Sequence, residues 1–159
     1  MLVKGRDEEV SVFGVRHGCR RDTSYVTSRI ESDRFNTGFV EKDPEVPLDE
    51  YGFQIRKIIG YLREVNANII DFDEKLDHQF YEEETPNGFD EITYDQNRSR
   101  EESVIRMRQS VKRQHPEVYK KIFLEREKRM TRIIDEWKDK NELRNAVIVV
   151  GESHVPPIY

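Results

Sequence analysis

The chain of 159 residues lacks most features that would place it in a specialised class of protein. It contains a single cysteine, Cys19, which excludes an internal disulfide and is typical of proteins from a reducing compartment. No apolar run approaches the roughly 20 residues that cross a bilayer. The first ten residues also lack the apolar segment of a signal peptide. We therefore expect a cytoplasmic protein without a membrane span.

An excess of positive charge is also missing. The 27 Lys and Arg residues are outnumbered by 32 Asp and Glu residues, which gives a net charge of -5 with both signs interspersed. Such a charge balance provides no general attraction for phosphates, so no nucleic-acid partner is expected. The length fits one domain with a core of its own. Oligomeric state is left open by the composition.

Four short segments rich in β-branched and aromatic residues are predicted to be strands. None alternates cleanly between apolar and polar residues, which favours strands covered on both faces, as in a parallel sheet. Helical patterns separate the first three of them, an order typical of right-handed βαβ units. The predicted strands cover residues 10–15, 37–40, 68–72 and 146–150.

The helical patterns have recognisable ends. Thr23 or Ser24 can cap a first helix, and Pro47 precedes a second that continues to Val65. Ser99 and Glu102 have the spacing of a capping box, and Pro116 begins a last helix with an apolar stripe that ends at Trp137.

Residues 81–97, between the third strand and the capping box, contain an acidic run and a Pro-Asn-Gly turn signal and are predicted to be an exposed loop. Together these elements predict a single three-layer α/β domain. It has a mostly parallel central sheet and a helical insertion before the last strand.

Polar residues follow each predicted strand at its carboxyl end. His17 follows the first strand, Glu41 the second, Asp71 and Asp73 lie at the end of the third, and His154 follows the fourth. In an open parallel sheet these ends meet at one edge, where such folds bind their ligands. Two histidines and two or three carboxylates at one edge can form a divalent-metal site or an acid/base site.

Three further residues fit this edge. Arg126 lies in the apolar stripe of the last helix, so it is expected to point inward and to need a carboxylate or an anionic ligand as its partner. Gly14 and Gly151 each precede a histidine by three residues, and they are expected to let the backbone turn sharply at the sheet edge. A purely structural interpretation stays open for each residue, since a strand-end carboxylate commonly caps a helix and Arg126 can pair with Glu41 for stability alone.

The motifs "VSVFGVRH", "ANIIDFD", "EREKRM" and "VVGESHVPPI", together with the strand-end Glu41, resemble the successive motifs of the TraB/Tiki superfamily. That family has two Gly-x-x-His motifs, a strand-end glutamate and an arginine-bearing helix, and the likeness spans residues 10 to 158. Its members include metal-dependent peptidases, erythromycin-esterase-like hydrolases, haem-binding proteins and pheromone-shutdown proteins. The resemblance implies a hydrolase of amide or ester bonds, on a peptide or a small ester.

The same resemblance implies roles for individual residues. His17, Glu41 and His154 would bind zinc, manganese or cobalt, and the metal would activate a water molecule or polarise a carbonyl group. Arg126 would steady Glu41 or a developing oxyanion. Asp73 would orient a histidine. Pro157 stands where the family has a glycine, which leaves open a catalytically silent binding or regulatory module of the same fold.

A second resemblance competes with the first. Arg16 and His17, followed by glycine, and the string "VPLDEYGFQ" are similar to motifs of the histidine phosphatases, in which the histidine is phosphorylated. The segment "DFDEKLDHQF" supplies no second arginine. Because Asp71, Asp73 and Glu74 would repel a phosphate, the hydrolase is the favoured interpretation.

Overall fold

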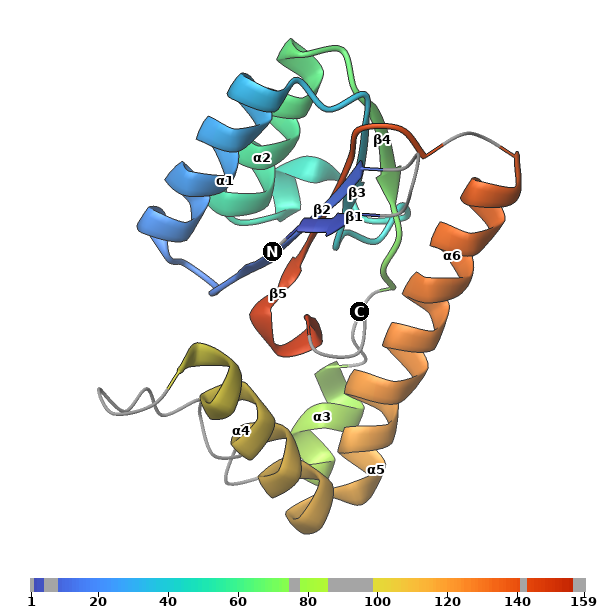
Figure 1. Cartoon of the computed structure of the whole chain (residues 1–159). Helices are drawn as coiled ribbons and strands as arrows, with labels where there is room; N and C mark the ends of the chain where they lie inside the picture. Colours follow the sequence, from blue (N-terminus) through green and yellow to red (C-terminus); the bar gives the residue numbers. More distant parts are fainter. Residues whose placement is uncertain (1, 5–8, 75–77, 86–98, 141–142, 156–159) are drawn as a thin grey trace.

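The computed structural model has a five-stranded sheet in the order β1-β2-β5-β3-β4 (Figure 1). The structure describes residues 2–4, 9–74, 78–85, 99–140 and 143–155. β2, β5, β3 and β4 are parallel, and β1 pairs antiparallel with β2. The mostly parallel sheet is confirmed, while β1 was not predicted. The strands are β1 (Leu2–Lys4), β2 (Glu9–Val15), β3 (Thr37–Val40), β4 (Asn68–Asp71) and β5 (Ala146–Gly151).

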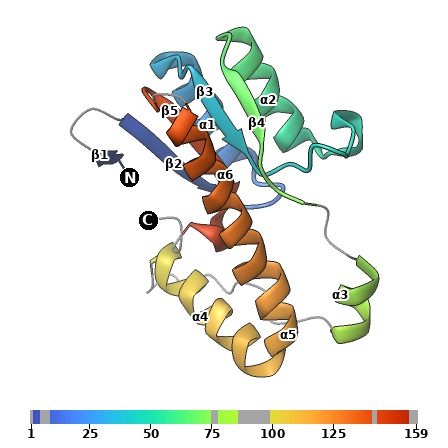
Figure 2. The same cartoon turned by 90° about the vertical axis from the view of Figure 1, so that its right-hand side faces the viewer.

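Helices cover both faces of this sheet and extend beyond one end of it (Figures 1 and 2). α1 and α2 lie on one face and α6 on the other, while α3, α4 and α5 gather beyond the carboxyl edge. Nine helical segments are described: α1 (Arg20–Asp33), η1 (Leu48–Glu50), α2 (Phe53–Glu64), α3 (His78–Glu84), α4 (Arg100–Gln114), α5 (Pro116–Tyr119), the π-helical η2 (Lys120–Glu125), α6 (Arg126–Lys140) and η3 (Glu152–His154).

Three apolar clusters hold the layers together. The first packs α1 and α2 on the sheet around Ile30, Ile58 and Leu62. The second packs α6 on the opposite face, with Met130 against the sheet residue Phe39. The third lies among α4, α5 and η2 and is independent of the sheet. All six residues of β5 are buried, as expected for a strand with two neighbours and covered faces. The three-layer α/β domain with a helical insertion before β5 follows from these contacts.

Some element boundaries differ from the prediction. α1 begins at Arg20, before both predicted caps, so Thr23 lies inside the helix, where its hydroxyl donates to the Cys19 carbonyl. The predicted helix from Pro47 to Val65 breaks at Tyr51, whose backbone is extended (φ -84°, ψ 150°). The capping box of Ser99 and Glu102 is confirmed, with the two bonds 3.0 and 3.1 Å long.

The predicted loop 81–97 is wrong at its start. Tyr81 to Glu84 belong to α3, where Gln79 donates to Glu83 across one turn at 2.9 Å. Glu82, Glu83 and Glu84 are exposed on that helix, because an acidic run is compatible with a solvated helical face. Residues 86–97 lie outside the described part of the chain.

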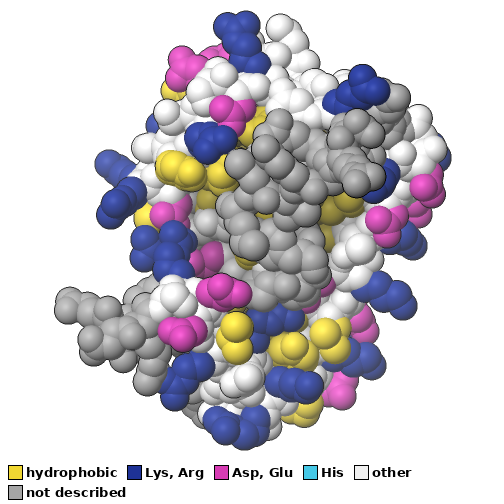
Figure 3. Space-filling model, viewed as in Figure 1, with side chains coloured by type: hydrophobic (Ala, Val, Ile, Leu, Met, Phe, Trp, Pro, Cys, Tyr) yellow, Lys and Arg dark blue, Asp and Glu magenta, His cyan; other side chains and the backbone are white. Residues whose placement is uncertain are grey.

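The surface agrees with the charge pattern of the sequence. On the face shown in Figure 3, basic and acidic side chains are interspersed and no continuous basic area is formed. Within the described residues, none of the helices combines the length and the apolar character that a membrane crossing requires.

Candidate functional site

The strand order brings three predicted site residues to one place. β5 lies between β2 and β3, so Gly151 is level with Val15 of β2, and Val149 is level with Val40 of β3. His17 follows β2 and Glu41 follows β3, and η3, which carries His154, continues from β5. The carboxyl ends of three adjacent strands therefore meet, as the crevice rule for parallel sheets predicts.

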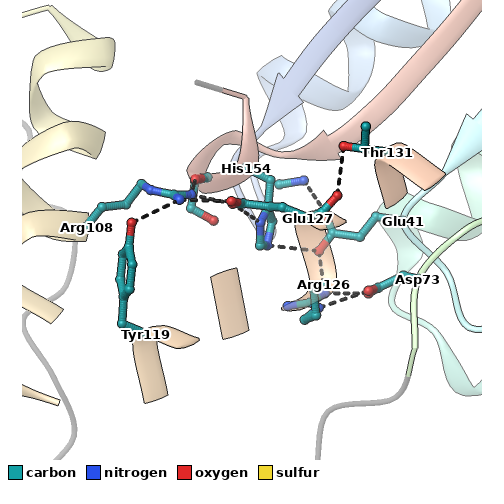
Figure 4. A network of polar contacts seen from close by, with 10 residues as sticks. Glu41, Asp73, Arg108, Tyr119, Arg126, Glu127, Thr131 and His154 are labelled. Carbon is teal, nitrogen blue, oxygen red and sulfur yellow. Dashed lines mark hydrogen bonds and ion pairs between the residues drawn. The ribbon is translucent and has the colours of Figure 1, made fainter. Parts of the chain in front are cut away.

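Glu41 is the centre of this group (Figure 4). Its Oε1 accepts a hydrogen bond of 2.8 Å from Arg126 Nη2, and its Oε2 accepts one from the Gly151 backbone N–H. His154 Nε2 lies 3.7 Å from Glu41 Oε1. Only 11% of the Glu41 side chain is exposed, so these contacts replace most of its hydration.

Gly151 lies where the side chains of His17, Glu41 and His154 approach one another. A Cβ atom at this position would lie 3.3 Å from Glu41 Oε2, 3.6 Å from His17 Nε2 and 3.7 Å from His154 Cδ2. His17, Glu41 and His154 therefore surround one glycine, as their strand-end positions predicted. The chain passes from β5 into η3 at Gly151, but this does not require a glycine, because φ of Gly151 is -56°, a value that other residues adopt readily. A methyl group here would fit tightly only against Glu41 Oε2, which would have to move by a few tenths of an ångström.

Gly14 has the same explanation. It is not among the described residues with positive φ, and a Cβ atom here would collide with the side chain of Val155 and approach the Glu152 Cα to 3.0 Å. It therefore allows η3 to pack against the end of β2. Of the two glycines in the Gly-x-x-His strings, Gly14 has the stricter spatial requirement.

Arg126 lies inward, as predicted, with 7% of its surface exposed. Besides Glu41, it binds Asp73 with two nitrogens: Nε donates to Oδ1 at 2.9 Å, and Nη2 donates to Oδ2. The prediction that Asp73 orients a histidine is not what the contacts show, because its carboxylate faces the guanidinium. Asp71, the last residue of β4, is directed elsewhere and pairs with Lys42 at 2.9 Å, whereas Asp73 lies beyond the end of the strand.

His154 is buried behind Glu41, with 3% of its surface exposed. Its Nδ1 lies 2.9 Å from Oε1 of Glu127. Arg108 binds both carboxylate oxygens of Glu127 through its two terminal nitrogens, and its Nη1 also donates to the Ser153 carbonyl at 2.7 Å. A chain of polar side chains thus runs from α4 to just beyond β4, in the order Arg108, Glu127, His154, Glu41, Arg126 and Asp73, and its longest step is the 3.7 Å between His154 and Glu41 (Figure 4).

Sequence reasoning missed Arg108 and Glu127, although a signal was present for both. Arg108 lies among the buried residues Val104, Met107 and Val111, at the spacing of one helix face. Glu127 lies four residues after Phe123 and three before Met130, so it belongs to the same apolar stripe as Arg126. A charged residue inside an apolar stripe indicates a buried ionic partner in each case.

A cavity of about 410 Å³ opens onto this group. His17, Glu41, Asp73, Arg126 and Gly151 line its polar part, whereas His154 is not among the lining residues. Arg126 Nη1 donates to no acceptor within the described residues, so this nitrogen is available to a ligand. His17 is exposed at the cavity. Apolar side chains complete the wall: Val15, Val46, Ile55, Val149 and Val150.

The protonation of Glu41 follows from its neighbours. Burial by itself would raise the pKa of this carboxyl group, but the charges of His154 and Arg126 and the Gly151 N–H outweigh it. The net pKa therefore lies below the ordinary value of 4.5. Burial lowers the pKa of Arg126, but the bonds to Asp73 and the charge of Glu41 more than reverse this effect and raise it. At neutral pH the cavity floor is an ionised carboxylate beside a permanent cation.

The residues, as they are placed, do not fit a divalent metal. Among the described residues, no group of three or more His, Cys, Asp or Glu side chains is arranged to hold a metal ion. The guanidinium of Arg126 occupies the position beside Glu41 Oε1 that a cation would need, and the Gly151 N–H occupies Oε2. A metal bound by His17, Glu41 and His154 would have to displace Arg126.

The residues that carry the phosphatase resemblance are engaged elsewhere. Arg16 donates from its backbone N–H at 3.1 Å and from Nε at 3.3 Å to Asp22, and it lines a separate cavity with Arg21 and Arg100. Gln54 Nε2 donates to the Arg16 carbonyl and to the Thr23 hydroxyl, both structural contacts between β2, α1 and α2.

Comparison with known proteins adds no assignment: no protein-family model, no curated protein and no solved structure matches this chain. Pro157, where the last motif departs from the TraB/Tiki pattern, lies outside the described residues.

Proposed function

We propose that this protein is a hydrolase of TraB/Tiki type that cleaves an ester or amide bond in the cavity at the carboxyl edge of the sheet. The observation that carries the proposal is the buried polar chain that ends at this cavity. Five of its six members are less than 9% exposed. Buried ion pairs stabilise a fold poorly compared with apolar residues of similar size, so such a chain is better explained by a chemical role.

The cavity offers the groups that hydrolysis requires. His17, the exposed imidazole, takes a proton from water while the water oxygen bonds to the substrate carbonyl carbon. Glu41, ionised beside it, stabilises the imidazolium that forms. Arg126 Nη1 binds the oxyanion. His17 then gives its proton to the leaving alcohol or amine as the carbon–oxygen or carbon–nitrogen bond breaks.

The metal that the resemblance implies has no step in this proposal, because Arg126 occupies its position beside Glu41. Zinc, manganese or cobalt dependence is a separate prediction that the same assay can test. Activity that is unchanged by a chelator supports the route through His17. Activity that is lost with a chelator and restored by one of these metals would support the metal route.

The experiment is a hydrolysis assay with nitrophenyl esters and peptide nitroanilides on the purified chain. We expect His17→Gln to lower kcat/KM roughly 100-fold or more, which is the usual contribution of a general base. The control is His115→Gln, because His115 lies at the end of α4, outside the site. Equal activity in the two variants would contradict the proposal.

The phosphatase and the silent module remain the alternatives. Phosphorylation of His17 would require Arg16 to leave Asp22, and the four carboxylates that line the cavity oppose a phosphate: Glu41, Glu50, Asp73 and Glu74. Hydrolysis of a nitrophenyl phosphate ester but of no carboxylic ester would favour the phosphatase. The cytoplasmic setting stays a prediction from the single cysteine.

A further inference from the structure

Arg126 and Glu127 are adjacent residues of α6, and their side chains contact different members of the site. Adjacent helical residues point about 100° apart, so Arg126 reaches Glu41 and Asp73 while Glu127 reaches His154 on η3. Glu127 is 5% exposed and His154 is 3% exposed. The pair is therefore shielded from the water that would otherwise let the imidazole rotate or exchange its protons between the two nitrogens.

The carboxylate of Glu127 is itself held in one orientation. Arg108 binds both of its oxygens, the parallel arrangement that fixes a carboxylate most firmly. The guanidinium of Arg108 also lies 4.5 Å from the ring centroid of Phe123 and donates to the Ser153 carbonyl, next to His154. One arginine thus holds the carboxylate and the short helix that carries the imidazole.

An ionised carboxylate can only accept hydrogen bonds, so the contact of 2.9 Å requires the proton on Nδ1 of His154. The opposite nitrogen, Nε2, is then directed at Glu41 Oε1, 3.7 Å away. This distance is too long for a direct hydrogen bond.

We propose that Glu127, clamped by Arg108, is a positioning residue that keeps the proton of His154 on Nδ1 and its Nε2 directed at Glu41. The geometric part of this inference is independent of the reaction. Its consequence for catalysis rests on the proposed hydrolase function, in which Glu41 must stay ionised and correctly oriented beside His17.

The test is Glu127→Gln in the full chain, with the nitrogen signals of His154 observed by NMR on histidine labelled with ¹⁵N. His154→Gln assigns the signals among the four histidines. We expect wild-type His154 to show a protonated Nδ1, and the variant to show a mixture of tautomers because an amide can donate or accept. We also expect kcat to fall roughly 10- to 100-fold at unchanged KM, as for other residues that orient a functional histidine.

Two further variants provide a control for Glu127→Gln and a replacement if that variant does not fold. Glu125→Gln is the matched control, since Glu125 is exposed on the same stretch of helix. If Glu127→Gln does not fold, Arg108→Met combined with Glu127→Leu removes the whole ion pair, a change that is often neutral for stability. It also frees Nδ1 in the same way.

Unchanged His154 signals in a folded Glu127 variant would overturn the positioning role, even if the melting temperature falls. Altered signals with the control unchanged support it. If the signals change as expected but the wild-type chain hydrolyses no ester or amide, the hydrolase proposal fails and the positioning role stands.

Discussion

Arg126 is the residue on which most of the site depends, because a single guanidinium binds two carboxylates. An apolar side chain in this position leaves both carboxylates without their cation, so replacing Arg126 should destabilise the fold.

We predict that Arg126→Leu lowers the free energy of unfolding by about 3–5 kcal/mol at pH 7. The folded-state pKa of Glu41 is lowered, so its contribution to stability is present above pH 4.5 and is lost as the pH falls through the lower folded-state value. The difference between variant and wild type should therefore shrink below pH 4.5. Urea unfolding at several pH values measures it.

Arg129→Leu is the control for this prediction. Arg129 lies three residues further along α6 and pairs with Glu74, and both side chains are more than a third exposed. Exposed pairs contribute about 1 kcal/mol or less. If both variants lose the same free energy of unfolding, the buried ion pairs of Arg126 contribute no more than an exposed pair, which would contradict the prediction.

Gly151 gives a second prediction at the residue scale. Gly151→Ala introduces a methyl group among Glu41, His17 and His154, at 3.3 to 3.7 Å. We expect a stability loss of only about 1 kcal/mol but a loss of hydrolysis of at least roughly tenfold, because small displacements of reacting groups are costly.

The comparison variant is Gly60→Ala, in the interior of α2, where the new methyl group meets no atom within 4 Å. It should raise the free energy of unfolding by about 0.5–1 kcal/mol and leave activity unchanged. Thermal melts and the ester assay on both variants decide whether space at Gly151 matters for chemistry.

At the scale of elements, the packing of α2 on β3 sets the position of Glu41. Gly38 lies in β3, three residues before Glu41, and a Cβ atom there would lie 2.7 Å from Leu62 Cδ1 and 2.9 Å from Leu62 Cδ2. β3 and α2 therefore pack so closely at Gly38 that a larger residue would collide with Leu62.

Gly38→Ala should therefore destabilise the fold by about 1–3 kcal/mol through overpacking. The effect should be smaller when Leu62→Ala is already present, with a coupling of about 0.5–3 kcal/mol in a double-mutant cycle measured by denaturant unfolding. Strict additivity of the two changes would contradict this account of the helix–strand contact.

For the molecule as a whole, the charge of the cavity is a property that several elements create together. Four carboxylates line the cavity, Glu41, Glu50, Asp73 and Glu74, against one arginine, Arg126. Asp73 and Glu41 share the single positive charge of Arg126, and Glu74 pairs with Arg129, whereas Glu50 is exposed at the cavity. The cavity should therefore favour a substrate with a cationic group.

We predict that an ester with a free amino group is hydrolysed with a higher kcat/KM than its acetylated counterpart. Glu50→Gln should reduce this preference roughly two- to fivefold, since an exposed charge contributes about 1 kcal/mol or less. Glu64→Gln, at the end of α2 and away from the cavity, is the control. Equal kcat/KM values for the two esters, or a higher value for the acetylated ester, would contradict the prediction.

What the sequence by itself determined is local. The runs at 37–40 and 146–150 were predicted as buried strands and Ser99 with Glu102 as a helix start, and the structure confirms all three, because hydrophobic period and capping chemistry are contained in a few neighbouring residues. The inward direction of Arg126 followed from the same period. Arg108 and Glu127 could each have been found in this way, but their pairing could not, since they lie on different helices.

Only the tertiary structure decided that β5 enters the sheet between β2 and β3. Strand order depends on which apolar faces α1, α2 and α6 cover, and this is a long-range property that no local pattern encodes. With β5 at the edge of the sheet, Gly151 would not lie among His17, Glu41 and His154, and the same strand-end residues would form no common site. The partners of Arg126 were also decided by the tertiary structure. The apolar stripe predicted that Arg126 faces inward, but its two carboxylate partners, Glu41 after β3 and Asp73 after β4, come together only in the folded sheet.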